Sequence, residues 1–391
     1  MPTTFLTGAT GFIGAEILRR LLREPGRRVY ALVRAPDAAY AVQRGRQVLF
    51  RLFLDDRAAT DDAKRRIRWV LGDIARPGLG LAPDDRAEVA AECDEIIHAA
   101  ASTDWDLSLE EAEAVNVTGV QGIVDLAAEV ARGRRLSRLV HVSTAYVSGR
   151  RDGPVSPDEL PGPKGPFNNT YEATKAKAER ILRERMGELP TTVVRPSIVV
   201  GNSRTGRTFN FNVIYFPLKL MYRGLLPVMP GRPSTTLDLV PVDYVCDATL
   251  ALGRDASAVG RTFHLTADDD AIPLTDFADR ITAFFNELRG PERPALRRPR
   301  MIGPLAWRGV RWWMARRLEG NAKRQFEAFN IYLPYILTDK RFLADGTRRA
   351  LEGRVPYPPV ASYLLCVAEY AVTREWGREV SWAPELMRDD L

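Results

Sequence analysis

The fold is decided by Thr7-Gly8-Ala9-Thr10-Gly11-Phe12-Ile13-Gly14, which follows a short apolar stretch and leads directly into a helical pattern. In a strand–turn–helix unit, glycines at this spacing allow a tight turn, a close backbone approach to a pyrophosphate and close packing of helix on strand. The N-terminus of the helix then faces the phosphates. We therefore expect a dinucleotide to contact Gly8, Thr10, Gly11, Phe12, Ile13 and Gly14.

Outward from this turn, the first half of the chain alternates short apolar runs with helical patterns. Such alternation predicts an α/β fold, a Rossmann-type doubly wound parallel sheet. The expected strands are Thr4–Thr7, Arg28–Val33, Ile67–Leu71, Glu95–Ala99, Arg138–Ser143 and Thr192–Val194. The expected helices include Ala15–Leu22, Asp37–Phe53, Asp106–Val130 and Tyr171–Arg185.

The end of the second expected strand indicates which dinucleotide fits. An NAD-binding unit places a carboxylate there, whereas an NADP-binding unit places arginine near the 2′-phosphate. Arg34 ends this strand, and the first acidic residue after it is Asp37. Arg34, with Arg44 as a second candidate, can make charge-assisted contacts to phosphate. The predicted cofactor is NADPH, with further contacts from Asp73, Ile74, Ala99, Ala100 and Ala101 at the next strand ends.

The candidate catalytic residues follow the fifth strand and open the next helix. Tyr171 and Lys175 are four residues apart, so their side chains share one helical face. A tyrosine pKa is about 10, and we expect the ammonium and an oxidised nicotinamide to lower it. Of the strand-end hydroxyls Ser143 and Thr144, we predict that Thr144 hydrogen-bonds the substrate oxygen as charge develops.

The order of these motifs resembles the extended short-chain dehydrogenase/reductases. It runs GxxGxxG, Val-Arg, Gly-Asp, His-x-Ala-Ala, Asn-Val-x-Gly, Ser-Thr-Ala, Tyr-x-x-x-Lys and Arg-Pro-Ser. Within that family the chain is most similar to fatty acyl-CoA reductases and to the thioester reductase domains of carboxylic acid reductases and nonribosomal peptide synthetases. Stretches 31–34, 142–147, 194–201 and 238–243 carry this similarity, which covers roughly the first two-thirds of the chain.

The resemblance implies a catalytic set of Thr144, Tyr171 and Lys175, with Asn116 supporting the lysine through water. It also implies that Tyr171, Lys175, Pro196 and Ser197 contact the cofactor. The implied reaction transfers hydride from NADPH to the carbonyl of an acyl thioester, and loss of thiol then gives an aldehyde. The sequence also allows a second reduction to the alcohol. No adenylation region or carrier-protein serine motif is present, so we expect a separate acyl-CoA or acyl-carrier-protein partner.

The remaining residues indicate two parts in the chain. Regular alternation stops after residue 201, and the chain is mainly helical and rich in aromatic residues from residue 261. We expect a Rossmann domain over 1–205, with a returning segment near 236–252. A smaller, mainly helical substrate-binding region would comprise 206–235 and 253–391. The Pro- and Gly-rich stretch 149–169 is interpreted as either a surface connection or a lid.

Composition narrows the class of protein. The 391 residues are 45% hydrophobic and 27% charged, which excludes a disordered or collagen-like chain. The net charge of +6 indicates no particular acidic partner, and we expect no nucleic acid. The three cysteines and three histidines are dispersed, so we expect no metal site and a cytoplasmic location.

A helical stretch at 304–318 carries three tryptophans among arginines. We favour a helix that packs against the core, and the alternative is a helix that makes peripheral membrane contact or receives an acyl chain. The sequence indicates no oligomeric state.

Two other functions stay open. One is an extended reductase that acts on a free ketone or secondary alcohol of the 3β-hydroxysteroid type, or on a nucleotide sugar. The missing carboxylate after the second strand disfavours the nucleotide sugar. The other is a non-enzymatic NADP-sensing regulator, which the intact Tyr171 and Lys175 disfavour.

Overall fold

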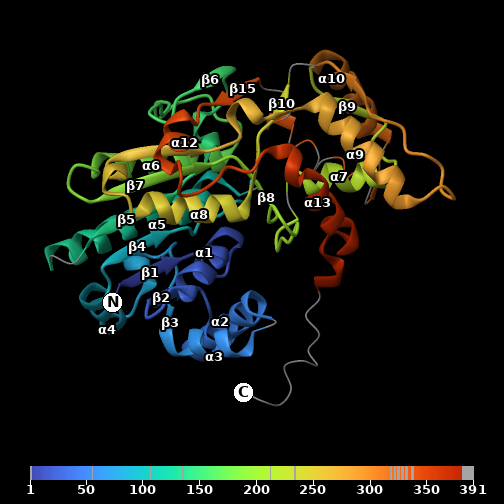
Figure 1. Cartoon of the computed structure of the whole chain (residues 1–391). Helices are drawn as coiled ribbons and strands as arrows, with labels where there is room; N and C mark the ends of the chain where they lie inside the picture. The colour runs from blue at the N-terminus through green and yellow to red at the C-terminus, as the bar shows by residue number, and fades with distance from the viewer. Residues whose placement is uncertain are drawn as a thin grey trace. The chain divides into compact units, whose positions relative to one another are not determined.

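The computed structural model describes residues 2–54, 56–105, 107–133, 136–211, 213–232, 235–317, 319–320, 323, 326, 330, 333–335 and 339–380. The chain forms two compact units (Figure 1). The sheet unit consists of Met1–Ser197, Val242–Asp269 and Lys340–Tyr357. The helical unit consists of Ile198–Pro241, Asp270–Asp339 and Pro358–Leu391.

The sheet unit is built on seven parallel strands in the order β12-β7-β5-β4-β1-β2-β3. The strands are β1 (Thr3–Thr7), β2 (Arg28–Val33), β3 (Ile67–Leu71), β4 (Glu95–His98), β5 (Arg138–Val142), β7 (Thr191–Pro196) and β12 (Arg261–Leu265). The order reverses between β1 and β4, and ligands of such sheets bind beyond the carboxyl ends of the strands at this point. The predicted doubly wound α/β fold is confirmed.

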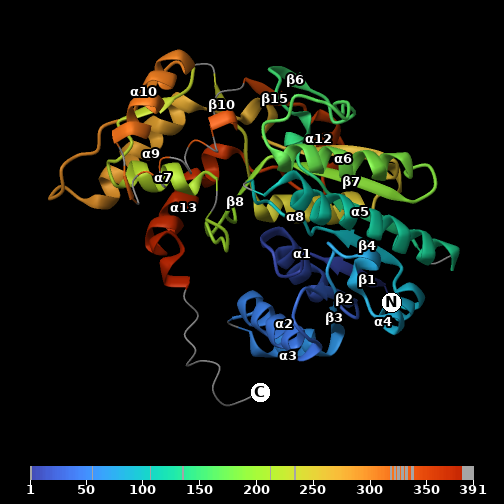
Figure 2. The ribbon, with the colours of Figure 1, turned by 180° about the vertical axis from the view of Figure 1, so that it is seen from behind.

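Helices cover both faces of this sheet (Figures 1 and 2). They are α1 (Phe12–Arg23), α2 (Ala38–Leu52), α3 (Arg57–Arg66), α4 (Pro83–Glu92), α5 (Leu109–Arg132), α6 (Thr170–Glu184), α8 (Val242–Gly253) and α12 (Asp345–Leu351). Helices α4, α5 and α6 bury their apolar sides against the central strands in one continuous core. Gly253 of α8 lies against Val140 of β5, where a Cβ would come within 2.7 Å of the valine side chain.

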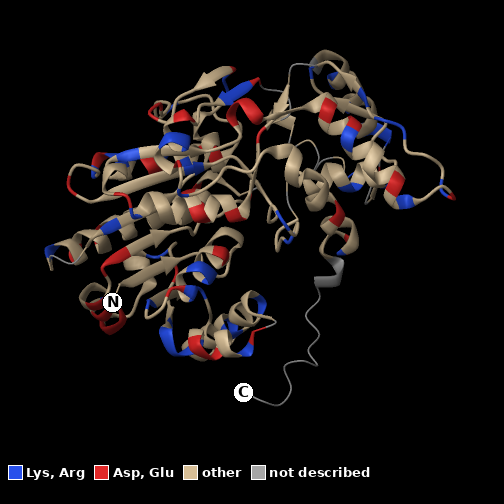
Figure 3. Ribbon diagram, in the orientation of Figure 1, with Lys and Arg blue, Asp and Glu red and all other residues tan. Residues whose placement is uncertain are grey.

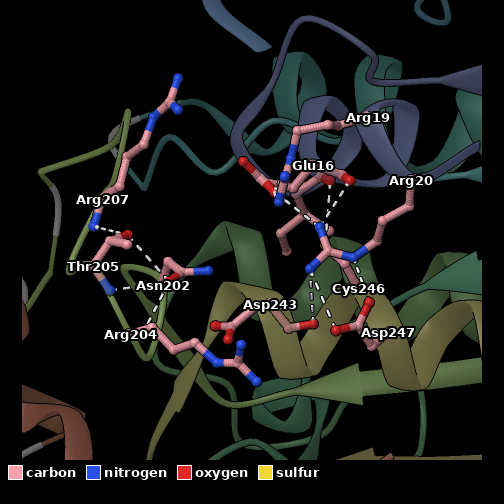
Figure 4. A network of polar contacts seen from close by, with 11 residues as sticks. Glu16, Arg19, Arg20, Asn202, Arg204, Thr205, Arg207, Asp243, Cys246 and Asp247 are labelled. Atoms are coloured by element: carbon pink, nitrogen blue, oxygen red, sulfur yellow. Dashed lines mark hydrogen bonds and ion pairs between the residues drawn. The ribbon is translucent and has the colours of Figure 1, made fainter. Parts of the chain in front are cut away.

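Helix α1 is fixed to α8 by a half-buried arginine (Figure 4). The Arg20 guanidinium contacts Glu16 Oε2 at 2.8 Å and Asp247 Oδ1 at 2.5 Å, and it donates to the carbonyl of Asp243 at 3.3 Å. One side chain therefore joins an i,i+4 pair on α1 to two residues of α8. This contact fixes the helix whose first turn follows the glycine-rich stretch.

The helical unit includes the α-helices α7 (Tyr215–Tyr222), α9 (Leu274–Arg289), α10 (Pro304–Arg317) and α13 (Val360–Thr373). Short strands pair as β8 (Ile198–Val200) with β11 (Leu239–Pro241), β9 (Val228–Pro230) with β14 (Arg300–Ile302), and β10 (Thr236–Leu237) with β13 (Ile272–Pro273). Tyr363 of α13 donates to the carbonyl of Leu239 at 2.8 Å, which joins the last helix to the first strand pair.

The tryptophans of α10 divide between core and surface. Trp307 is buried beside Phe326, whereas Trp312 and Trp313 are 60% and 52% exposed. Their rings lie under Arg316 and Arg317, the arrangement of a cation–π contact. Core packing thus accounts for Trp307 but not for Trp312 and Trp313, and peripheral membrane contact stays the alternative prediction for this helix. Within the described part of the chain, no helix combines the length and apolar character needed to cross a bilayer.

The division of the chain differs from the sequence-based one. Residues 253–269 and 340–357 belong to the sheet unit, although they were expected in the substrate-binding region. The returning segment also divides, because β11 pairs with β8 in the helical unit while α8 covers the main sheet. The strand that joins the main sheet is β12, whose apolar pattern is interrupted by Thr262 and His264. Contacts inside the unit satisfy both polar side chains, from Arg183 to Thr262 and between His264 and the carbonyl of Leu343.

Candidate dinucleotide and catalytic site

The glycine-rich turn lies against the end of β4. Gly8 has a φ of +79°, and a Cβ there would lie 2.7 Å from the backbone nitrogen of Ala100. A Cβ on Gly14 would lie 2.1 Å from the Gly8 carbonyl oxygen, so α1 can begin here only with glycine. Gly11 closes the turn by donating to the same oxygen at 2.8 Å.

The neighbouring residues leave this turn open for a ligand. Gly11 is exposed, and Thr10, Phe12 and Ile13 are half-buried. Ala99, Ala100 and Ala101 are also half-buried, and their small side chains continue the wall beside Gly8. A cradle of glycine and alanine backbone before a helix N-terminus fits the pyrophosphate of a dinucleotide.

The residues expected at the adenosine end lie where β2 and β3 finish. Arg34 is exposed, and Arg44 donates to its carbonyl oxygen at 2.9 Å. Arg44 therefore positions the backbone of Arg34. Asp37 accepts a hydrogen bond from the backbone N–H of Tyr40, so its carboxylate serves as the N-cap of α2.

Asp73 and Ile74 follow β3 directly. The Asp73 side chain is half-buried and accepts from the backbone N–H of Ala75 at 3.0 Å. Ile74 is buried against Gly119 of α5, where a Cβ would come within 3.2 Å of it. Ile74 thus packs between the strand and α5, beside the half-exposed carboxylate.

Three predicted catalytic side chains meet where β5 and β7 end. Lys175 is buried, and its Nζ donates to the carbonyl of Val142 at 2.9 Å. Thr144 is buried one residue beyond Ser143, and its hydroxyl lies near enough to the phenol of Tyr171 to lower the pKa of that phenol. The Thr144 hydroxyl also lies 3.5 Å from the carbonyl oxygen of Pro196. The structure therefore brings Thr144, Tyr171 and Lys175 together.

The pKa values of this set depart from the expected direction. Burial raises the pKa of Tyr171 to about 12; the nearby hydroxyl of Thr144 opposes this and the charge of Glu172 adds to it. Burial lowers the pKa of Lys175 to about 8, although the charge of Glu179 opposes the change. In the protein without cofactor, desolvation thus outweighs any effect of the ammonium on the phenol. A protonated phenol at neutral pH is suited to donating to a carbonyl oxygen.

Asn116 lies on α5 beside the catalytic helix. Its Nδ2 donates to Thr174 Oγ1 at 3.0 Å and to the Ser102 carbonyl at 3.3 Å, and its Oδ1 accepts from the Ser102 backbone N–H at 2.9 Å. The amide therefore joins the segment after β4 to the residue that precedes Lys175. A water-mediated role toward the lysine stays a prediction.

The structure adds a buried ion pair that the sequence analysis missed. Arg195 and Glu179 are fully buried, and Arg195 Nη2 lies 2.6 Å from Glu179 Oε1. Ser143 donates to the same carboxylate at 2.7 Å, so its hydroxyl is engaged by the ion pair. Burial by itself raises the pKa of Glu179, but Arg195, Arg183 and Ser143 together hold it below its usual value. The sequence feature that could have revealed this ion pair is a glutamate one helical turn after Lys175, combined with the arginine of the Arg-Pro-Ser motif.

Pro196 and Ser197 complete the end of β7. Both are buried, and the backbone N–H of Ser197 donates to the carbonyl of Leu265 at the end of β12. The carbonyl oxygen of Pro196 lies 3.5 Å from the Thr144 hydroxyl, which places this strand end beside Thr144. The predicted contact with the cofactor is compatible with this place at the strand ends and stays a prediction.

The stretch 149–169 is attached to the catalytic helix. Its short strand β6 (Gly153–Val155) pairs with β15 (Lys340–Phe342). Arg180 donates to the carbonyl of Pro161, Arg183 to that of Asp158 at 2.8 Å, and Arg195 to that of Glu159 at 3.0 Å. The middle of this stretch therefore depends on arginines of α6 and β7.

Comparisons with known proteins agree with this geometry. Residues 6–249 match the model of an NAD-binding family described as male sterility protein. The chain is 31% identical over 286 residues to fatty acyl-CoA reductase wat of Drosophila melanogaster, a match that covers 64% of this chain and 54% of that protein. It is 30% identical over 289 residues to a linear gramicidin synthase polypeptide of Brevibacillus parabrevis, with 72% of this chain and 5% of that protein covered.

A solved structure extends the comparison to nearly the whole chain. The terminal R domain of the myxalamid PKS-NRPS biosynthetic pathway superposes with a TM-score of 0.79 at 28% identity, over 96% of this chain and 92% of that one. The chain spans about half the length of the fly protein and a small part of the gramicidin synthase. The resemblance indicated by the sequence motifs is confirmed.

The buried ion pair leads to a first prediction. We expect Glu179→Gln to lower the free energy of unfolding by about 3–5 kcal/mol, because Arg195 would keep a buried charge without its partner. Glu184→Gln, an exposed position on the same helix, is the matched control. Chemical denaturation measures both, and adding Arg195→Met to Glu179→Gln should recover part of the loss. Equal stability of the two single variants would contradict a structural role for the pair.

The lowered pKa of Lys175 leads to a second prediction. Between pH 8 and pH 10 the unfolded lysine keeps its proton while the folded one, with a pKa of about 8, releases it. The free energy of unfolding of the wild type should therefore rise relative to Lys175→Met, by on the order of 2 kcal/mol across this range. Denaturation curves at several pH values measure the difference. Lys177→Met removes an exposed lysine paired with Glu113 and should show no such trend; parallel curves for Lys175→Met would refute the assignment.

Proposed function

The chain belongs to the male sterility protein family of NAD-binding domains, and we propose that it is an NADPH-dependent reductase of acyl thioesters. The observation that carries the proposal is the meeting of Thr144, Tyr171 and the buried Lys175 at the strand ends, in the same unit as the glycine-rich turn. Similarity to both a fatty acyl-CoA reductase and a gramicidin synthase supports a thioester as the shared substrate class.

The residues at the strand ends fit the dinucleotide. The cradle of Gly8, Gly11 and Ala100 would hold the pyrophosphate, and Arg34 would pair with the 2′-phosphate, because no carboxylate occupies that position. Asp37, the nearest acid, is engaged as a helix cap. When bound, NADPH supplies the hydride.

Each catalytic side chain has a separate task in the proposed reaction. Tyr171, protonated at neutral pH because its pKa is about 12, donates its proton to the thioester carbonyl oxygen as hydride reaches the carbon. Thr144 donates a hydrogen bond to the same oxygen, and Lys175 places a positive charge at the end of β5. The resulting hemithioacetal loses the thiol, which leaves an aldehyde. A second hydride transfer through the same residues would give the alcohol.

The source of the acyl group is a separate partner in this proposal. Either an acyl-CoA or an acyl chain on a carrier protein would present the same thioester to Thr144 and Tyr171. Relatives of both kinds support the shared chemistry, and direct assays with the two substrates distinguish them.

The proposed reaction predicts that Tyr171→Phe abolishes thioester-dependent oxidation of NADPH. We expect at least a hundredfold loss of kcat, because the phenol that protonates the oxyanion is removed, while NADPH affinity is retained. Tyr40→Phe, at an exposed position on α2, is the control. The assay follows absorbance at 340 nm with decanoyl-CoA or a decanoyl carrier protein, and chromatography identifies aldehyde or alcohol. Turnover of ketones or secondary alcohols with none of any thioester would eliminate the proposal.

Cofactor preference gives a further prediction. Arg34→Ala should raise the KM for NADPH about 10- to 100-fold and leave that for NADH nearly unchanged, because a charge-assisted contact to the 2′-phosphate is lost. Arg46→Ala, an exposed arginine on α2, serves as the control. Steady-state kinetics with both dinucleotides measures the effect. A wild type that prefers NADH would contradict the assignment.

A further inference from the structure

A cavity inside the helical unit has no role in the proposed reaction. Its volume is about 360 Å³, and it lies between the end of α7, one face of α9 and the segment that leads into β14. The described residues that line it include three arginines and no acidic side chain. In Figure 3 the loop between α9 and β14 carries blue segments, which mark its arginines.

The three lining arginines are Arg223, Arg289 and Arg297. Arg289 Nη1 is shielded from solvent and has no hydrogen-bond acceptor among the described residues. Leaving a buried charged donor unpaired costs free energy. An anion in the cavity would remove this cost. Arg223 and Arg297 are exposed at the rim and form no ion pair within the described ranges.

The walls of the cavity are held by contacts within the unit. Thr282, Phe285 and Arg289 share one face of α9. Asn286, on the same helix, accepts from the backbone N–H of Leu296 at 2.7 Å and donates to the Leu296 carbonyl at 3.1 Å. This double hydrogen bond holds the arginine-bearing segment to the helix. The cavity is therefore formed before a ligand enters.

The lining indicates the chemistry of the ligand. Guanidinium groups bind phosphate in a bidentate manner. The positive charge of three guanidinium groups is more than a single carboxylate would neutralise. Pro227, Pro294 and Ala295 form an exposed apolar floor, whereas Met221, Leu226 and Phe285 are buried, and the volume lies within the range of small-molecule sites. A bare phosphate ion would leave this floor uncovered. Both features together require a phosphate ester with a flat, partly apolar body.

We propose that this cavity binds a phosphorylated nucleotide, with the phosphates on Arg223, Arg289 and Arg297 and the base against the exposed apolar floor. Two sources share this chemistry. One is the 3′-phosphoadenosine end of a coenzyme A thioester, an assignment that rests on the proposed function. The other is a free nucleotide that acts as an effector. The matched control is Arg298, adjacent in sequence but paired with Asp279 and absent from the lining.

Calorimetric titration of the full chain with adenosine 3′,5′-bisphosphate tests the site. Saturating NADP⁺ is present throughout, so that the dinucleotide turn is blocked. We expect binding to the wild type and to Arg298→Ala, and at least a tenfold weaker affinity in Arg289→Met and in the rim variant Arg297→Ala. No binding to the wild type, equal binding by the two lining variants, or inorganic phosphate binding as tightly as the nucleotide would overturn the proposal. Circular dichroism verifies that each variant is folded.

Kinetics then distinguish the two sources. If the nucleotide is part of the substrate, Arg289→Met raises the KM for decanoyl-CoA at least tenfold and leaves that for decanoyl-pantetheine unchanged. If it is a free effector, both KM values stay unchanged while binding of adenosine 3′,5′-bisphosphate is lost. Either result supports the site. If the wild type turns over no thioester, the proposed function is refuted. The calorimetric titration still tests whether the cavity binds a nucleotide.

Discussion

The active end of the sheet unit depends on the buried ion pair between Glu179 and Arg195. Glu179 lies one turn after Lys175 on α6, and Arg195 lies on β7 just before Pro196. The Glu179 carboxylate binds Arg195 and so joins α6, the helix of Tyr171 and Lys175, to β7. Ser143, which follows β5, donates a hydrogen bond to the same carboxylate. Two charges removed from water need such complete pairing. The same arginine holds the 149–169 stretch through Glu159, so one interaction orders helix, strands and loop together.

Much of this arrangement could be predicted because local patterns determine it. The glycine spacing specifies a turn in which a Cβ on Gly14 would collide with the backbone of Gly8, a contact within the motif itself. The parallel strands are apolar runs with turn residues between them, so the sequence predicts where most of them lie along the chain. Tyr171 and Lys175 were identifiable from their helical spacing together with their place after the glycine-rich turn and the strand end at Ser143 and Thr144.

The remaining features depend on residues far apart in sequence. Glu179 and Arg195 look like ordinary helix and strand charges until folding removes both from water. Strand β12 escaped detection because Thr262 and His264 break its apolar pattern, and their partners come from α6 and from the segment after β15. The pKa of Tyr171 depends on burial, which residue spacing does not reveal. The two compact units differ from the predicted domain limits where a late segment, Lys340–Tyr357, joins the sheet unit.

That return has a consequence for how the chain is made. The sheet unit takes its residues from three separated stretches, and the last, Lys340–Tyr357, supplies β15 and α12. Phe342 packs edge-on against Tyr146, and Thr347 donates to the carbonyl of His264. During synthesis these positions stay empty until residues 340–357 have left the ribosome. Closing such long loops is slow relative to local contacts. The nucleotide-binding end is thus encoded first, yet its unit is completed only after most of the helical unit has been translated.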